Sequence, residues 1–94
     1  MTETIKIGVI SILIKNRQTH AANVQDILTA HGHIVMARLG VNVQPFCLKN
    51  CTGLVSLAVK GSLKEINQLK GDLDRLYGIV AKKIIWGLYS TANT

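Results

Sequence analysis

The chain repeats one succession of apolar and polar positions. An apolar, strand-like run is followed by a helical pattern and then by a second apolar run, and the whole succession occurs twice. The six segments are residues 5–14, 17–31, 33–43, 53–60, 63–77 and 79–86. Two β-α-β units laid end to end in 94 residues predict an α+β, ferredoxin-like βαββαβ sandwich. We expect a four-stranded antiparallel sheet in the order 4-1-3-2, with two helices on one face.

The first and third strands are expected at the centre of this sheet. Two apolar sets alternate along residues 5–14, with Ile7, Val9 and Leu13 on one face and Ile10, Ile12 and Ile14 on the other. A strand that is apolar on both faces is buried on both, and residues 54–59 have the same character. The other two strands carry Arg38 or the pair Lys82 and Lys83, as edge strands often do.

The two helices differ in how clearly their ends are marked. For the first, Asn16 is the expected N-cap and Gly32 the expected exit. For the second, Ser62 and Glu65 have the spacing of a capping box, and Gly78 closes the helix.

A fold with both helices on one sheet face leaves the other face without cover. We assign five apolar residues to that face, together with part of residues 80–86: Ile10, Ile12, Ile14, Ile34 and Met36. Such a patch exceeds the few hundred Å² that a monomer normally exposes. The sequence therefore predicts a homodimer or homotetramer with these residues at the subunit interface.

Composition changes this picture little. A chain that is 48% hydrophobic and 17% charged suits a single domain over residues 1–94, ordered from about 4 to 89, with a polar tail at 90–94. The net charge of +6 permits nucleic acid or an acidic protein as partner, although ordinary solubilising charge is the simpler explanation. We expect a cytoplasmic protein without a membrane segment, because the start lacks a basic leader and residues 7–14 are too short to span a bilayer.

Few residues suggest reaction chemistry. Paired carboxylates, a glycine-rich phosphate loop and a Ser/His/Asp grouping are not visible, so we expect no enzymatic activity. In a cytoplasmic protein Cys47 and Cys51 are expected to be reduced thiols. Two thiolates make half of a tetrahedral metal site, and His20 comes from the same end of the fold. A transition-metal sensor built on these three residues is therefore an alternative to two bystander thiols, and no cofactor is otherwise required.

The junction between the first strand and the first helix is the expected ligand site. A helix N-terminus offers unpaired N–H groups and the positive end of the helix dipole. Four side chains accompany it there: Lys15, Asn16, Arg17 and His20. A small carboxylate or amino-acid effector suits these donors, although Asn16 capping the helix beside solvated cations is an equally simple explanation.

Two segments carry a resemblance to a known family. The first is Arg-Leu-Gly-Val at 38–41, and the second is 53–85, whose helix reads EINQLKGDLDRLYG at 65–78. Both resemble the iron-only hydrogenase system regulators, small ACT-like proteins that form dimers and tetramers. This resemblance covers nearly the full ordered chain and implies a βαββαβ fold and a regulatory role, with transcription regulation as the expected process.

The same family is similar to the ligand-binding domain of nickel-responsive repressors. Those repressors carry a His-x-His pair where this chain has residues 39–41 without histidine, and only Cys51 echoes their ligand cysteine. A ribbon-helix-helix segment is also missing, so we do not expect direct DNA binding. ACT domains bind small ligands near the first strand–helix junction at a subunit interface. The resemblance thus implies a non-enzymatic, self-associating regulatory domain with an effector site there; the alternatives are a metal sensor or a basic docking module.

Overall fold

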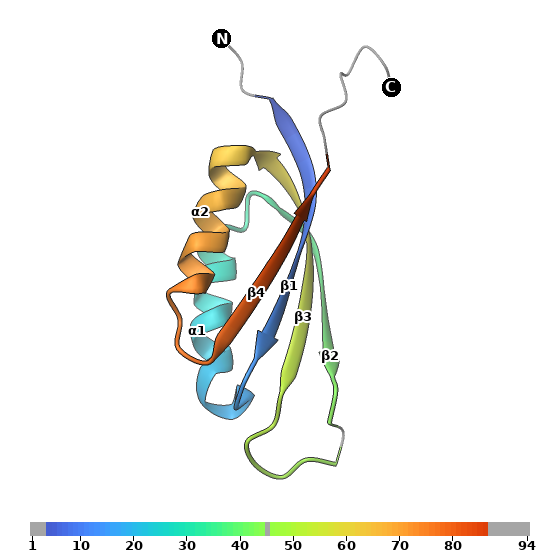
Figure 1. Ribbon diagram of the computed structural model, residues 1–94, viewed down its shortest axis with the longest axis vertical. Helices are drawn as coiled ribbons and strands as arrows, with labels where there is room; N and C mark the ends of the chain where they lie inside the picture. The colour runs from blue at the N-terminus through green and yellow to red at the C-terminus, as the bar shows by residue number, and fades with distance from the viewer. Residues whose placement is uncertain (1–3, 45, 87–94) are drawn as a thin grey trace.

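The computed structural model describes residues 4–44 and 46–86, which form six elements in the expected order. These are β1 (Ile5–Ile14), α1 (Arg17–Ala30), β2 (Val35–Asn42), β3 (Gly53–Ser62), α2 (Leu63–Asp74) and β4 (Ile79–Ile85). The strands form one antiparallel sheet in the order β2-β3-β1-β4, and both helices cover the same face (Figure 1). The predicted βαββαβ topology is confirmed. Among the described residues no helix is long and apolar enough to cross a membrane.

The central strands β1 and β3 pair over more residues than any other two strands of the sheet. β1 pairs with β3 over its full length, from Ile5 opposite Ser62 to Ile14 opposite Gly53. β2 and β4 lie at the two edges. The prediction that the two runs that are apolar on both faces occupy the centre is therefore confirmed, since each has a hydrogen-bonded neighbour on both sides.

The core lies between the helices and one face of this pair. Its buried residues are Ile10, Ile12, Ile14, Val24, Leu28, Ile34, Leu57, Val59, Ile66, Leu69, Leu73 and Ala81. The predicted assignment of faces was wrong, because Ile10, Ile12, Ile14 and Ile34 are at most 3% exposed in this core and offer nothing to a partner. Alternation shows which side chains share a face, but in a strand that is apolar on both sides it does not show which face the helices cover.

The uncovered face carries the other alternating set, and we call it the open sheet face. Following the strand pairings, its apolar members are Ile7, Val9, Leu13, Ala37, Leu39, Val41, Leu54, Ala58, Val80 and Ile84. Leu39 and Ile84 are 65% and 62% exposed. Near its middle Ser11 Oγ and Ser56 Oγ share a hydrogen bond of 3.1 Å. Met36, the fifth residue expected at an interface, is exposed beside an irregularity between Val35 and Ala37.

The start of α2 is fixed locally, as its sequence predicts. Ser62 Oγ accepts a hydrogen bond from the Glu65 N–H over 3.1 Å, and the Glu65 carboxylate accepts one from the Ser62 N–H over 3.0 Å. Two of the four unpaired N–H groups at this end of the helix are thereby satisfied. The capping box is confirmed.

Replacing Ile12 by alanine tests the corrected position of the core. We expect Ile12→Ala to lower the free energy of unfolding by about 2–5 kcal/mol, because it removes buried methyl groups and leaves a cavity. The measurement is urea denaturation followed by circular dichroism. Leu48→Ala is the control, because Leu48 is 94% exposed and its loss should change stability by less than about 0.5 kcal/mol. Equal effects of the two substitutions would contradict the assignment.

Candidate functional site: the start of α1 and the β2–β3 loop

Asn16 occupies the N-cap position of α1 in a way the sequence does not reveal. Its backbone is left-handed, with φ 49° and ψ 65°, and its side chain makes no capping hydrogen bond. Only its carbonyl is used, accepting from the N–H groups of Thr19 and His20 over 3.0 and 3.2 Å. Asparagine tolerates this conformation better than most residues, so the position is explained although the predicted side-chain cap is wrong.

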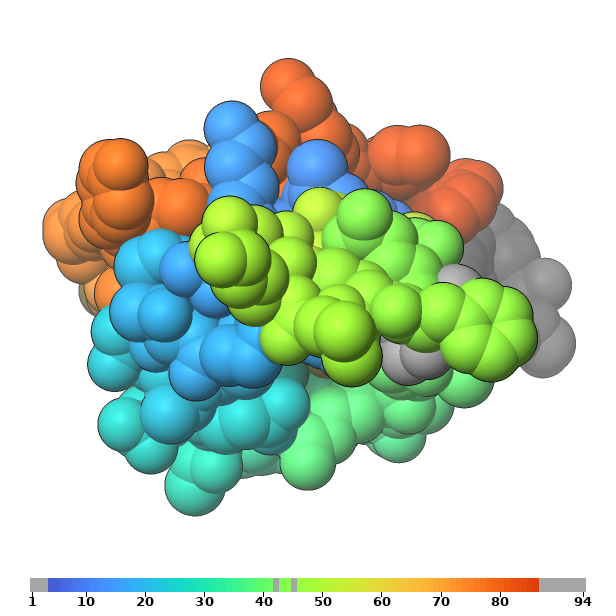
Figure 2. Space-filling view, turned by 90° about the horizontal axis from the view of Figure 1, so that it is seen from below, coloured from blue at the N-terminus to red at the C-terminus, as the bar shows by residue number. Residues whose placement is uncertain are grey.

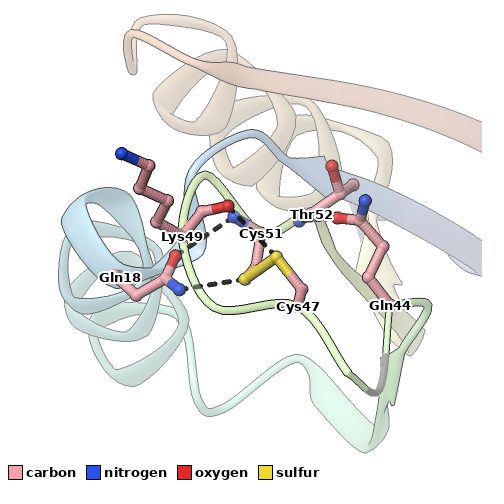
Figure 3. Close-up of a disulfide and its surroundings, with 6 residues drawn as sticks. All are labelled: Gln18, Gln44, Cys47, Lys49, Cys51 and Thr52. Atoms are coloured by element: carbon pink, nitrogen blue, oxygen red, sulfur yellow. Dashed lines mark hydrogen bonds between the residues drawn. A yellow bond between two sulfur atoms is a disulfide. The ribbon is translucent and has the colours of Figure 1, made fainter.

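The β2–β3 loop, distant in sequence, caps the start of α1 instead. The Arg17 N–H donates to the Cys51 carbonyl over 2.7 Å. The Gln18 amide binds the same residue twice: its Nε2 donates to Cys51 Sγ over 3.0 Å, and its Oε1 accepts from the Cys51 N–H over 3.3 Å (Figure 3). From below, the loop lies directly against the β1–α1 junction (Figure 2). No local pattern around Gln18 marks this role, because its partner is distant in sequence.

Cys47 and Cys51 form a disulfide within this loop, and this overturns the expectation of reduced thiols. Their Cα atoms are 5.7 Å apart, and Asn50 between them adopts a left-handed conformation with φ 55°. Cys51 is fully buried. The loop is braced on its inner side by the Thr52 N–H, which donates to Gln44 Oε1 over 2.6 Å. Whether a C-x3-C pair closes depends on this turn, which the spacing alone does not specify.

The predicted metal site at His20, Cys47 and Cys51 is not formed. Both sulfurs are consumed by the disulfide, and His20 packs elsewhere, against Gly78 and edge-on to Tyr77 with 5.7 Å between ring centroids. Within residues 4–44 and 46–86 no group of three histidine, cysteine or carboxylate side chains could hold a metal ion. The donor set does not fit a transition metal.

The four residues predicted to bind a ligand surround the start of α1 but divide between its two sides. The Lys15 N–H donates to the Gly78 carbonyl over 2.8 Å, on the same side as His20. The stem of Arg17 instead covers Gly53, at the opening of β3. Beside it lies a cavity of 280 Å³ lined by Ile14, Arg17, Ala21, Gln25, Gly40, Val41, Gly53, Leu54 and Val55. Of the four, Arg17 lines this cavity.

The segments that form this junction, residues 15–20 and 43–52, carry basic side chains and no acidic ones. Lys15, Arg17 and Lys49 belong to the junction or the loop. The five carboxylates of the chain lie elsewhere in the sequence, at Glu3, Asp26, Glu65, Asp72 and Asp74. A surplus of positive charge beside a helix N-terminus favours an anion over a cation as guest.

The remaining two histidines, at and just after the C-terminal end of α1, each pair with a carboxylate of α2. His31 Nε2 lies 2.7 Å from Asp72 Oδ2, and His33 Nε2 lies 3.0 Å from Glu65 Oε2. The hydrogen bond from His31 lowers the pKa of the Asp72 carboxyl, and Arg75 adds to this effect. The pKa of Glu65 is lowered chiefly by the hydrogen bond from the Ser62 N–H. His31 therefore has a specific carboxylate partner on α2.

This pairing predicts a particular dependence of stability on pH. Because the pKa of Asp72 is lower in the folded than in the unfolded chain, the pair stabilises the fold above the unfolded pKa of about 3.9, and this stabilisation is lost as the pH falls through the folded pKa. Asp72→Asn and His31→Leu should both flatten the fall in unfolding free energy between about pH 5 and pH 2, measured by denaturant titration. An acid limb identical to that of the unchanged protein would show that the pair is not formed.

Comparisons with known proteins agree with this architecture. Residues 6–83 match a family described as "TM1266-like: Iron-only hydrogenase system regulator, putative". A search of curated proteins finds no significant match. Among solved structures, the uncharacterized protein TM1266 from Thermotoga maritima superposes with a TM-score of 0.78 at 18% identity, covering 88% of this chain and 99% of that one.

More distant structures share the fold alone. CPII from Thiomonas intermedia K12, a nitrogen regulatory PII-like protein, was solved with ADP, AMP and acetate and again with ADP, AMP and bicarbonate. The two structures superpose with TM-scores of 0.51 and 0.50 at 13% identity, and each match covers 88% of this chain and 91% or 98% of CPII. At this identity the likeness confirms a ferredoxin-type sandwich and carries no site residues. The family match spans most of the sequence, and the chain therefore belongs to the TM1266-like family.

Proposed function

We propose that this chain is a non-enzymatic regulatory domain that self-associates through its open sheet face and binds a small anionic effector beside α1. The family is described as a regulator of the iron-only hydrogenase system, which supports the regulatory part of the proposal. Self-association rests on one observation, the uncovered apolar face of the sheet.

The open sheet face is a contiguous and mostly apolar patch. Four strands spaced ~4.8 Å apart and about seven residues long span roughly 400 Å² in projection. This compares with the largest apolar patches on monomers, which are often functional. Lys60 and Lys82 supply its charge, and a depression of 270 Å³ beside Leu39 is lined mainly by Val9, Ala37, Leu39, Ser56 and Ala58. A second copy provides a matching apolar sheet, which makes it the occupant that suits this face.

Placing a charge on this face should dissociate the assembly. Leu39→Lys puts an ammonium group at the centre of an edge strand, where burial against a partner leaves it unpaired. We expect a mass of a dimer or tetramer for the unchanged protein and a monomer mass for Leu39→Lys, measured by light scattering at high micromolar concentration.

Leu48→Lys is the matched control for this substitution, because Leu48 lies on the loop away from the open sheet face and should leave the mass unchanged. The proposal is wrong if the unchanged protein is monomeric, or if both substitutions reduce the mass equally.

The effector site is proposed at Arg17. Arg17 lines the 280 Å³ cavity between α1 and the start of β3, where apolar residues form most of the wall and Gln25 adds an amide. A carboxylate held by Arg17 gains a charge-assisted hydrogen bond, and its apolar remainder fits the cavity. CPII, which shares the fold, was solved with acetate, bicarbonate and adenine nucleotides bound, so these anions join amino acids in the panel of test ligands.

Calorimetry tests this placement. We expect one or more small carboxylates to bind, and Arg17→Met to weaken that binding by about ten- to a hundredfold, as loss of a hydrogen bond to a charged group predicts. Methionine keeps an unbranched stem over Gly53, so the helix start should remain intact. Lys64→Met on α2 removes the same charge at a distance and should not change the affinity. Unchanged affinity in Arg17→Met places the site elsewhere.

A further inference from the structure

The two sulfurs of the Cys47–Cys51 bridge lie in different environments. Cys51 is fully buried at the start of α1, where Gln18 Nε2 donates a hydrogen bond to its Sγ over 3.0 Å. Cys47 is only partly buried, in the outer part of the loop. We propose that this bridge is a reversible thiol–disulfide exchange site that takes a dithiol as its reductant, with Cys47 as the attacked sulfur and Cys51 as the leaving sulfur.

The exchange transfers two electrons and two protons. One thiolate of the dithiol bonds to Cys47 Sγ, the bond between the two cysteines breaks, and Cys51 Sγ leaves with the electron pair and then takes a proton. The second thiol of the reductant attacks the mixed disulfide, Cys47 leaves and is protonated, and the reductant closes as a disulfide. The reverse sequence re-forms the bridge with a disulfide as oxidant.

The surroundings of Cys51 favour its departure as a thiolate. The Gln18 amide donor already faces its sulfur, and such a bond strengthens when the acceptor becomes an anion. The Cys51 carbonyl accepts the first N–H of α1, so the sulfur also lies at the positive end of the helix dipole. Arg17, whose N–H donates to the Cys51 carbonyl, adds a cationic residue at the same helix start. Since an exchange is faster when the leaving sulfur is stabilised as an anion, these groups assign the leaving role to Cys51.

The structure also accommodates the reduced state. Cys47 Sγ lies 3.1 Å from the Lys49 carbonyl oxygen, which can accept the proton of the free thiol. The inner limb of the loop stays held without the bridge, because Arg17 and Gln18 bind the backbone of Cys51. The outer limb, which carries Phe46 and Leu48 at 95% and 94% exposure, loses its covalent tie. Reduction therefore alters how these two apolar side chains are presented while α1 keeps its cap.

Reduction kinetics of the folded protein test the proposal. The full chain, purified without reductant, is treated with dithiothreitol in the absence of denaturant, quenched with an alkylating agent and weighed by mass spectrometry. We expect loss of the bridge while the far-ultraviolet circular dichroism remains native, and its return when oxidised dithiothreitol replaces the reductant. Two free thiols in the untreated protein, or a bridge that opens only after unfolding, would overturn the proposal.

Gln18→Glu isolates the role of the leaving sulfur. Glutamate keeps an oxygen that can accept from the Cys51 N–H but replaces the donor to Cys51 Sγ with a negative charge. We expect it to slow reduction about tenfold or more, given the strength of hydrogen bonds to charged groups. Gln68→Glu is the matched control, because it makes the same charge change at an exposed position on α2, away from the bridge. An equal or faster rate in Gln18→Glu contradicts the assignment.

Trapping identifies the attacked sulfur. A monothiol such as glutathione, followed by rapid acid quenching and peptide mapping, should leave its adduct on Cys47. Hydrogen exchange of the reduced protein should then rise in residues 46–49 and remain unchanged at the start of α1. An adduct found on Cys51 would reverse the proposed polarity, and a uniform rise in exchange would show that the bridge is a structural crosslink.

Discussion

The structure depends on a strand pair that is apolar on both faces in a fold that supplies only one layer of helices. β1 and β3 pair over ten residues each, and the helices bury one alternating set of their side chains, including Ile10, Ile12 and Leu57. The other set, with Val9 and Leu13, remains on the open sheet face. Burying apolar surface is the main favourable term in folding and association, and this is the physical basis of the proposed self-association through the uncovered set.

The second constraint is the start of α1. Asn16 is left-handed and its side chain does not cap the helix. Instead, the Cys51 carbonyl of the distant β2–β3 loop accepts a hydrogen bond from the Arg17 N–H, and Gln18 of the helix binds the Cys51 backbone in return. The same contacts place a disulfide, a cationic junction and the Arg17 cavity within one small region. The loop and the start of α1 are therefore joined by direct hydrogen bonds.

Sequence-based expectations were correct for features formed by residues close in sequence and were less accurate for contacts between distant segments. The capping box at Ser62 and Glu65 involves residues three apart, and it forms as predicted. The carbonyl that caps α1, the partner of Gln18 and the position of His20 against Gly78 all depend on segments distant in sequence, and each differed from expectation or was missed. The family resemblance at residues 38–41 and 53–85 was confirmed because those motifs are contiguous.

The sequence by itself determined the order of elements, the central strands and the family, because these follow from periodicity, local capping and contiguous motifs. Only the tertiary structure decided which face of β1 the helices cover. Ile12 and Leu13 lie on opposite faces and are both apolar, so the sequence does not distinguish the buried face from the exposed one. It also decided that Cys47 and Cys51 form a bridge rather than a metal site, because that outcome depends on a turn at Asn50 and on where His20 packs. Interactions between residues close in sequence specify the helices and strands, whereas contacts between distant segments decide which of their faces are buried and which side chains pair.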